Sequence, residues 1–474
     1  MTKFYSSLSE IKDGLQNRQV TVEGLVLDYL EAIRLNAHLN AFNEVFEEEA
    51  LQRAKNIDSR IQLGIAGKLA GMVIAIKDNI CYKGHQVSAS SKILKGFTSI
   101  YSSTVVERLL AEDAVIIGRC NCDEFAMGAS NESSYFGPVK NYADQTKVSG
   151  GSSGGSAVAV QAGMCHAAIG TDTGGSVRQP ASFCGVIGLK PTYGRISRHG
   201  IIAYASSFDQ VGPITRSVED AALLLEVMAG PDEYDSTLAT KPVPSFSANL
   251  QPTGKKKIAY LQESISSPGV DPEVKNTLIK YIDKLRAEGH TVKPIVFEYL
   301  DYLVPSYYIL AMAEASSNLA RFDGVHYGYR SPGATDLQST YKRSRSEGFG
   351  KEVKRRIMLG TFVLSAGYYD AYYAKAQKAR RLIREKTEQI LKEYDFILTP
   401  TAPEPAFAIG QEQSDPVVTY LADIFTVQAS LAGIPAISLP AGNNSKGLPL
   451  GLQLLTRQFE EQELLNFSKY FLGL

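Results

Sequence analysis

Two runs rich in glycine and serine place several hydroxyl groups on backbone that can come close to a small ligand. Residues 149–156 read Ser-Gly-Gly-Ser-Ser-Gly-Gly-Ser, and residues 171–178 read Thr-Asp-Thr-Gly-Gly-Ser-Val-Arg. A helix-like Ala-Val-Ala-Val segment follows the first run at once, which argues against a flexible linker. Because glycine lets the backbone approach a ligand closely, we interpret the two runs as a catalytic or ligand-binding site.

Two other interpretations of the first run fit less well. A phosphate-binding P-loop needs Gly-x-x-x-x-Gly-Lys followed by Ser or Thr, and no lysine stands at that place. Residues 150–154 match Gly-x-Ser-x-Gly, the nucleophile turn of α/β hydrolases, but that turn needs an apolar strand before it and residues 141–147 are polar. It also needs a histidine base, and none of the downstream histidines lies in a suggestive context.

Lys77 is a candidate base that needs no histidine. It directly follows the apolar run at residues 73–76, so we expect its amine to be at least partly buried. Desolvation lowers the pKa of a lysine, and a neutral amine can accept a proton near pH 7. Together with the Asp78-Asn79 pair and the downstream serines, this placement predicts that Lys77 activates a serine nucleophile.

Alternating helices and strands are expected to position these residues. Thr21 is a plausible N-cap of a helix within the first forty residues, and Ser103 of a helix that lies between two apolar runs. Those two runs, at 73–76 and 114–117, predict strands, and this order favours crossover connections and a buried sheet. Further strands are expected at 167–169, 258–261, 396–398, 436–439 and 450–455, and further helices at 156–164 and 368–394.

We therefore predict an α/β protein with a mixed, largely parallel central sheet covered by helices on both faces. Length alone would allow about three domains at ~150 residues each. The proline-containing stretch near 240–255 nevertheless suggests a surface linker between parts of one body. We expect a single domain over residues 1–474, with an N-terminal helical segment at 1–65.

Composition excludes several classes of protein. The 49 Lys and Arg residues balance 50 Asp and Glu, so the chain lacks the basic excess of proteins that grip nucleic acid by phosphate contacts. Five cysteines, an odd number, are expected to be reduced thiols, and Cys120-x-Cys122 is interpreted as packed thiols rather than half of a metal site. The N-terminus has no secretory signal and no segment is apolar enough to span a membrane, so a cytoplasmic location is expected.

Three separated motifs resemble the amidase signature family. They are Ala-Ile-Lys-Asp-Asn around Lys77, the run at 150–156, and the run at 170–178 that is followed by Pro180. They occur in the family's order over about a quarter of the chain. More narrowly, residues 314–324 and 344–356 resemble the A subunits of glutamyl-tRNA(Gln) amidotransferases, and that similarity extends over the whole sequence.

The resemblance implies a catalytic trio and an amidase signature fold. Ser176 would be the nucleophile that attacks the side-chain amide of glutamine, and Ser152, held by a cis peptide bond, would relay its proton to Lys77. These residues would fill the roles of nucleophile, base and orienting group without a histidine. The oxyanion hole would be formed by backbone N–H groups of Thr173, Gly174, Gly175 and Ser176.

The resemblance also implies how glutamine is held. Arg356 resembles a clamp for the α-carboxylate, Asp423 a partner for the α-ammonium group, and Tyr307 a wall of the pocket. We expect the opposite charges of Asp172 and Arg178, which flank the nucleophile, to form a structural ion pair that shapes the loop.

A glutaminase that released ammonia into water would be wasteful, so the resemblance implies that the ammonia passes to a partner. The expected complex is a heterotrimer. Its B subunit would be the kinase and transamidase, would use ATP and magnesium, and would make most of the tRNA contacts. A small C subunit would wrap around the junction between this chain and the B subunit. This chain would bind no cofactor itself and no membrane. Two alternatives stay open: a stand-alone amidase that acts on another carboxamide, and a non-catalytic scaffold.

Overall fold

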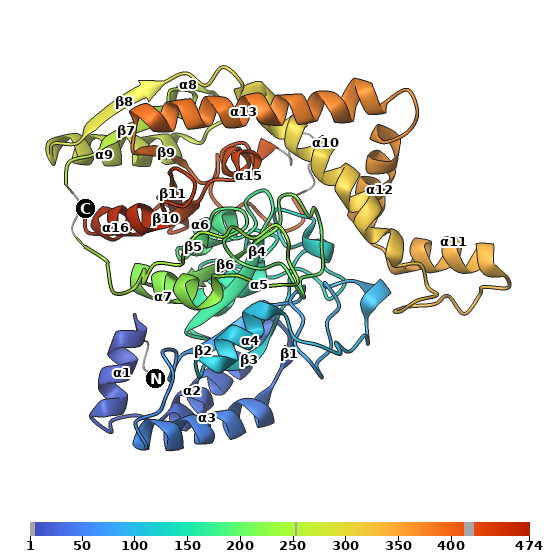
Figure 1. The fold of residues 1–474 in the computed structure, drawn as a ribbon, viewed down its shortest axis with the longest axis horizontal. Helices are drawn as coiled ribbons and strands as arrows, with labels where there is room; N and C mark the ends of the chain where they lie inside the picture. The colour runs from blue at the N-terminus through green and yellow to red at the C-terminus, as the bar shows by residue number, and fades with distance from the viewer. Residues whose placement is uncertain (1–4, 252–253, 412–420) are drawn as a thin grey trace.

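A mixed sheet of eleven strands organises the part of the protein that the structure describes (Figure 1). The computed structural model describes residues 5–251, 254–411 and 421–474. The strand order in the sheet is β1-β3-β2-β4-β6-β5-β10-β11-β9-β7-β8. The strands are β1 (Phe42–Val45), β2 (Val73–Lys77), β3 (Val115–Cys120), β4 (Ala167–Asp172), β5 (Ile187–Lys190), β6 (Gln210–Thr215), β7 (Lys257–Leu261), β8 (Thr291–Ile295), β9 (Phe396–Pro400), β10 (Ala436–Asn443) and β11 (Pro449–Leu455).

The mixed α/β class is confirmed, but the sheet contains fewer parallel pairs than the sequence predicted. The parallel pairs are β2 with β3, β2 with β4, β7 with β8 and β7 with β9. The other six pairings are antiparallel, and they include every pairing of β5, β6, β10 and β11. The two parallel parts are therefore joined through an antiparallel centre, which apolar strand patterns alone do not reveal because orientation depends on long-range pairing.

Helices cover both faces of the sheet. Helices α5 and α6 contact each other and the central strands, while α7 and α16 contact each other and the same region of the sheet. The helices are α1 (Leu8–Gln16), α2 (Val22–Leu35), α3 (Glu47–Gln62), α4 (Thr104–Ala111), α5 (Gly154–Gln161), α6 (Arg178–Cys184), α7 (Val218–Met228), α8 (Glu263–Ser266), α9 (Pro272–Ala287), α10 (Leu300–Asn318), α11 (Leu337–Gly348), α12 (Lys351–Val363), α13 (Ala374–Glu393), α15 (Val427–Ala432) and α16 (Glu461–Leu472). Short 3₁₀ turns and a π-helical turn, η5 (Tyr369–Tyr373), connect these elements.

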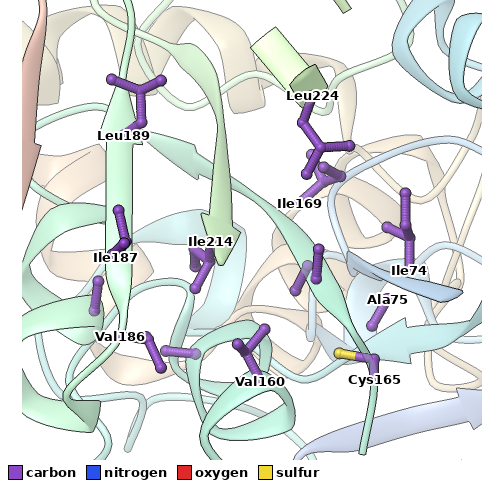
Figure 2. Packing of buried hydrophobic residues seen from close by; sticks show 14 of the residues in the cluster. Ile74, Ala75, Val160, Cys165, Ile169, Val186, Ile187, Leu189, Ile214 and Leu224 are labelled. Carbon is purple, nitrogen blue, oxygen red and sulfur yellow. The ribbon is translucent and has the colours of Figure 1, made fainter. Parts of the chain in front are cut away.

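The core lies where the central strands meet these helices. Figure 2 shows Ile74, Ile169 and Ile214, which come from the adjacent strands β2, β4 and β6, together with Val160 of α5 and Leu224 of α7. All five side chains are fully buried. Since complete burial of an aliphatic side chain contributes about 1.5–3 kcal/mol, this cluster fixes the strand ends that carry the site.

Local sequence signals explain where several helices begin. The Thr21 hydroxyl accepts a hydrogen bond from the Gly24 N–H and caps α2, and the Ser103 hydroxyl accepts one from the Val106 N–H and caps α4. Both N-caps are as predicted. The helix expected at 368–394 begins with the π-helical turn η5 before α13, a change that the apolar spacing did not indicate.

Residues 5–65 contain helices α1, α2 and α3, with strand β1 between α2 and α3, and β1 pairs antiparallel with β3. The described residues between α7 and β7 form no regular helix or strand. In the part of the chain that the structure describes, no helix is both long and apolar enough to cross a bilayer. All five cysteines are free and buried.

Candidate active site

Lys77 is the last residue of β2, and its side chain is fully buried. The strand runs in the middle of a parallel group, so its carboxyl end presents Lys77 at the edge where the two Gly/Ser runs lie. Burial lowers the pKa of Lys77 to about 8, although nearby Cys122 and Asp123 partly oppose the shift. The predicted burial of this amine is therefore confirmed, and an appreciable fraction of it is neutral near physiological pH.

The amine of Lys77 lies among hydroxyl groups. Its Nζ is 2.6 Å from Oγ of Ser152, 3.0 Å from Oγ of Ser153 and 3.0 Å from Oγ1 of Thr171. The Asn79 amide also donates to Oγ1 of Thr171, at 3.0 Å. These contacts orient the amine toward Ser152, which has the shortest distance of the three.

Ser152 and Ser176 are brought together by their loops. The peptide bond between Gly151 and Ser152 is cis, as the family resemblance implied. The backbone N–H of Ser153 donates to the carbonyl of Ser176 at 3.1 Å, which joins the two Gly/Ser runs directly. Ser152 is fully buried whereas Ser176 is 8% exposed, so Ser176 is the serine that a substrate can reach.

The second Gly/Ser run carries backbone N–H groups that have no acceptor among the described residues. Within the described part of the chain, no group accepts a hydrogen bond from the N–H groups of residues 173–176. The next two N–H groups, of Val177 and Arg178, point at the Asp172 carboxylate instead. Because buried N–H groups are almost always paired, four consecutive unpaired ones indicate a site for an anionic oxygen.

Glycine is required at two positions of this loop. A Cβ added at Gly174 would lie 2.5 Å from Cζ of Tyr307, and one added at Gly175 would lie 2.5 Å from Oγ1 of Thr426. Gly175 also has a φ of +142°, a conformation that residues with a side chain rarely adopt. The close approach of Tyr307 places this side chain against the loop, as expected for a pocket wall.

Asp172 and Arg178 form a fully buried ion pair with two parallel contacts. Nε of Arg178 is 2.9 Å from Oδ2 of Asp172, and Nη2 is 2.9 Å from Oδ1. Arg178 also donates to the Thr426 carbonyl and to Gln453. Burial alone would raise the pKa of Asp172, but Arg178 holds that pKa below its ordinary value. The pair thus ties the loop to β11 and α15, in agreement with the predicted structural role.

Arg356 and Asp423 both contact the side chain of Tyr308, although they are far apart in the sequence. Asp423 accepts a hydrogen bond from the Tyr308 hydroxyl at 2.6 Å, and the guanidinium carbon of Arg356 is 5.3 Å from the centre of the Tyr308 ring. The Tyr307 ring packs edge-to-face on Tyr308, with 5.0 Å between ring centres. The structure therefore brings the three predicted glutamine-contacting residues together.

These two charged side chains are both largely buried, at 4% exposure for Arg356 and 9% for Asp423. Burial raises the pKa of Asp423 to about 6, while Tyr308 and Arg356 partly counter that rise. Arg356 is also held by Glu352 at 2.8 Å and by the Tyr204 hydroxyl at 2.9 Å. Two buried side chains of opposite charge that contact the same tyrosine suit the two charged ends of a zwitterionic α-amino acid.

Several neighbours of these residues were missed by sequence reasoning. Tyr204 and Tyr308 contact the predicted clamp, and Ser153 and Thr171 contact the Lys77 amine. Ser153 and Thr171 stand inside the Gly/Ser runs, so the runs themselves were a usable signal. No local pattern distinguishes Tyr204 or Tyr308 from an ordinary core tyrosine.

The histidines take no part in this cluster. Among the described residues, no histidine bonds to the Lys77 amine, and the buried His166 instead pairs with Asp220 at 2.9 Å. No group of three or more His, Cys, Asp or Glu side chains that could hold a metal ion occurs in the described ranges. Cys120 and Cys122 are both fully buried, in line with their interpretation as packed thiols.

Comparison with known proteins agrees with this geometry. The Amidase family model matches residues 24–465. The A subunit of glutamyl-tRNA(Gln) amidotransferase from Chlorobium luteolum is 50% identical over 468 residues, which cover 98% of this chain and 96% of the relative. A protein of the same name from Clostridium botulinum is 50% identical over 461 residues, covering 97% of this chain and 95% of the relative.

Solved structures show the same relationship. The A subunit of glutamyl-tRNA(Gln) amidotransferase from Thermotoga maritima has a TM-score of 0.76 and 39% identity, over 95% of this chain and 93% of that one. A peptide amidase from Stenotrophomonas maltophilia has a TM-score of 0.81 and 29% identity, over 97% of this chain and 95% of that one. With a family match over most of its length and relatives at half identity, the chain belongs to the amidase family.

Proposed function

We propose that this protein is the glutaminase subunit of a tRNA-dependent amidotransferase, hydrolysing glutamine and delivering ammonia to a partner. The single observation that carries the proposal is the buried contact of 2.6 Å between the Lys77 amine and the Ser152 hydroxyl, which lies beside a loop whose N–H groups have no acceptor in the described part of the chain. The names of the relatives that span almost the whole chain support the particular assignment.

The reaction follows from these groups. The Ser176 hydroxyl attacks the side-chain amide carbon of glutamine, and its proton passes through the Ser152 hydroxyl to the neutral amine of Lys77. The N–H groups of residues 173–176 stabilise the negative oxygen that forms on that carbon. The same proton then leaves with the amide nitrogen as ammonia, and water cleaves the glutamyl ester to give glutamate.

Glutamine is recognised by its two charged ends. Arg356 binds the α-carboxylate, Asp423 binds the α-ammonium group, and Tyr307 closes the pocket beside the oxyanion loop. A simple carboxamide lacks both charges and cannot use either contact. This pocket therefore favours the glutaminase over the alternative of a stand-alone amidase with another substrate.

The partners follow from what the acceptor reaction needs. Activation of Glu-tRNA(Gln) requires ATP and magnesium, which we assign to a B subunit, together with most of the tRNA contacts. A small C subunit completes the proposed heterotrimer. The near-zero net charge of this chain agrees with a minor part in tRNA binding, and a role in aminoacyl-tRNA synthesis fits the cytoplasmic location expected from the sequence.

The direct test is the variant Ser176→Ala in the chain co-purified with its native partners. We expect glutamine hydrolysis to fall to background while assembly, followed by size-exclusion chromatography, is unchanged. Undiminished ammonia release from the variant would refute the assignment of Ser176. Wild-type protein that hydrolyses simple carboxamides as readily as glutamine would instead favour the stand-alone amidase, and wild-type protein without any hydrolysis would favour the scaffold.

A further inference from the structure

The segment Tyr204–Asp209 lies between the oxyanion loop and the residues that we assign to glutamine binding, and it bonds to both. We propose that Asp209 is a positioning residue that holds the oxyanion loop and the Arg356 clamp in one fixed arrangement. The clamp half of this proposal rests on the proposed function, whereas the loop half requires only an acyl-transfer site at Ser176.

The Asp209 carboxylate uses both of its oxygens. Oδ1 accepts a hydrogen bond from the Thr173 hydroxyl at 2.7 Å, and Oδ2 accepts from the backbone N–H groups of Tyr204 and Ala205 at 2.8 Å and 3.1 Å. Asp209 is 5% exposed. A buried carboxylate that accepts three hydrogen bonds fixes its partners relative to one another, because each lost bond would leave a buried polar group unpaired.

The Tyr204 side chain extends this arrangement to the clamp. Its hydroxyl accepts a hydrogen bond from Nη1 of Arg356 at 2.9 Å, while Glu352, on the same helix α12, accepts one from Nε at 2.8 Å. Arg356 is thus fixed on one side by its own helix and on the other by the residue whose backbone Asp209 holds.

The same segment also supports the pocket wall. The ring of Phe208 packs edge-to-face on Tyr307 with 5.5 Å between centres, and the guanidinium carbon of Arg380 lies 4.0 Å from the centre of the Phe208 ring. Tyr307 in turn approaches Gly174 so closely that no side chain fits there. Displacement of the segment would therefore move the loop from two directions, through Thr173 and through Tyr307.

Loosening the contact of Asp209 with Thr173 and loosening the contact of Tyr204 with Arg356 should have different kinetic consequences. Thr173 is the first residue after β4, so its side-chain bond fixes the orientation of the peptide groups that follow. Loss of a whole oxyanion donor costs about 10²–10³ in kcat, so loosening the loop should cost about tenfold. Loosening Arg356 should weaken glutamine binding and raise KM.

The test compares Thr173→Val with Thr173→Ser in the assembled protein. Valine has the shape of threonine without its hydroxyl, whereas serine keeps the hydroxyl and loses a methyl group. We expect Thr173→Val to lower kcat for glutamine about tenfold with KM within about twofold, and Thr173→Ser, which keeps the hydroxyl, to lose severalfold less activity than Thr173→Val. Equal losses in both variants, or a wild-type kcat in Thr173→Val, would overturn the proposal.

A second pair of variants tests whether Tyr204 and Asp209 position Arg356 for glutamine binding. Tyr204→Phe should raise KM for glutamine at least about threefold, with a smaller effect on the hydrolysis of propionamide, which has no α-carboxylate for Arg356. Asp209→Asn has only one side-chain oxygen to accept hydrogen bonds, so it should lower kcat and raise KM together. An Asp209→Asn protein that folds, by circular dichroism, and keeps both constants overturns the positioning role.

These outcomes are distinct from failure of the proposed function. Wild-type protein that hydrolyses propionamide but not glutamine would refute the glutaminase assignment, and the Thr173 pair would then be compared on propionamide. Wild-type protein that hydrolyses glutamine while the Thr173 and Asp209 variants behave like it would refute the positioning role alone.

Discussion

At the scale of single residues, the environment of Lys77 decides the chemistry. An exposed lysine is almost entirely protonated at neutral pH and cannot act as a base, whereas burial lowers the pKa of this one to about 8. The surrounding hydroxyl groups of Ser152, Ser153 and Thr171 accept hydrogen bonds without adding a charge. The amine is therefore held in place and can still lose its proton.

This pKa predicts the pH dependence of glutamine hydrolysis. The neutral amine is the active form, so kcat/KM should rise with pH up to about 8 and level off above it. Asp423, whose pKa burial raises to about 6, must be ionised to bind an ammonium group, so its protonation should lower kcat/KM further below that pH. Initial rates across about pH 5–9.5 test this, and a flat profile between about pH 6.5 and 8 would contradict it.

Substitution of Lys77 by arginine separates charge from basicity. Arginine stays protonated, so Lys77→Arg should lower kcat about a thousandfold, within the range that general-base catalysis contributes. The matched control is Lys190→Arg, because Lys190 is also buried at a strand end but donates to the Pro191 carbonyl at 3.0 Å rather than to the serines. Ammonia release measures both, and a near-normal turnover in Lys77→Arg would remove Lys77 from the mechanism.

At the scale of elements, the site is built from a strand end, two loops and the helices that hold them. Lys77 ends β2, the cis-serine loop precedes α5, and the oxyanion loop lies between β4 and α6. The Asp172–Arg178 pair joins the oxyanion loop to α15 and β11. Correct placement of the loop therefore depends on a buried ion pair as well as on apolar packing.

Breaking this pair should destabilise the fold strongly. Asp172→Asn leaves the buried guanidinium of Arg178 without its counter-charge, which typically costs about 3–5 kcal/mol of unfolding free energy. The control is Glu388→Gln, which breaks the exposed pair with Arg384 on α13 and should cost less than about 1 kcal/mol. Urea unfolding followed by circular dichroism compares them, and equal midpoints would contradict a stabilising role for the buried pair.

A small side chain added to the oxyanion loop should impair turnover. Gly174→Ala places a methyl group 2.5 Å from Cζ of Tyr307, so either the ring or the loop must move. We expect kcat for glutamine to fall about tenfold or more, because oxyanion stabilisation depends on preorganised donors. Gly269→Ala, whose added Cβ meets only Oγ of Ser267 at 3.7 Å, is the control and should keep wild-type kinetics.

The sequence allowed prediction of the elements whose signals are local. The apolar run before Lys77 predicted a strand end and a buried amine, and the Gly/Ser runs predicted loops near a ligand. The antiparallel centre of the sheet was not predictable, because pairing of β10 with β5 joins residues far apart in the chain. Arg356 and Asp423 were found only by resemblance, since a lysine- and arginine-rich helix such as α12 is typical of a solvated surface.

Tyr204 and Asp209 escaped prediction for a different reason. Both stand in an irregular segment between strands, where neither apolar period nor spacing signals a function. Their importance arises from bonds to Thr173 and Arg356, which come from distant parts of the chain. Residues that act by holding other residues are recognised only once the tertiary contacts are known.

At the scale of the whole molecule, the proposed role divides one reaction between two proteins. In this proposal, the chain makes ammonia from glutamine. Its partner uses the ammonia to convert the activated side-chain carboxylate of tRNA-bound glutamate into an amide. The two halves share only ammonia, so a block in the first half should leave the second intact. That independence gives a test that neither a stand-alone amidase nor a scaffold would pass.

The complex carrying Ser176→Ala should make no Gln-tRNA(Gln) from glutamine, Glu-tRNA(Gln), ATP and magnesium, because its nucleophile is absent. Addition of ammonium chloride in place of glutamine should restore product, since free ammonia at the partner's site replaces the ammonia that this chain would deliver. Charged tRNA separated on acid gels measures both reactions, with the wild-type complex as the control. If ammonium fails to restore product in the variant but supports it in wild type, Ser176 affects the partner's site as well, and the proposed division of the reaction is wrong.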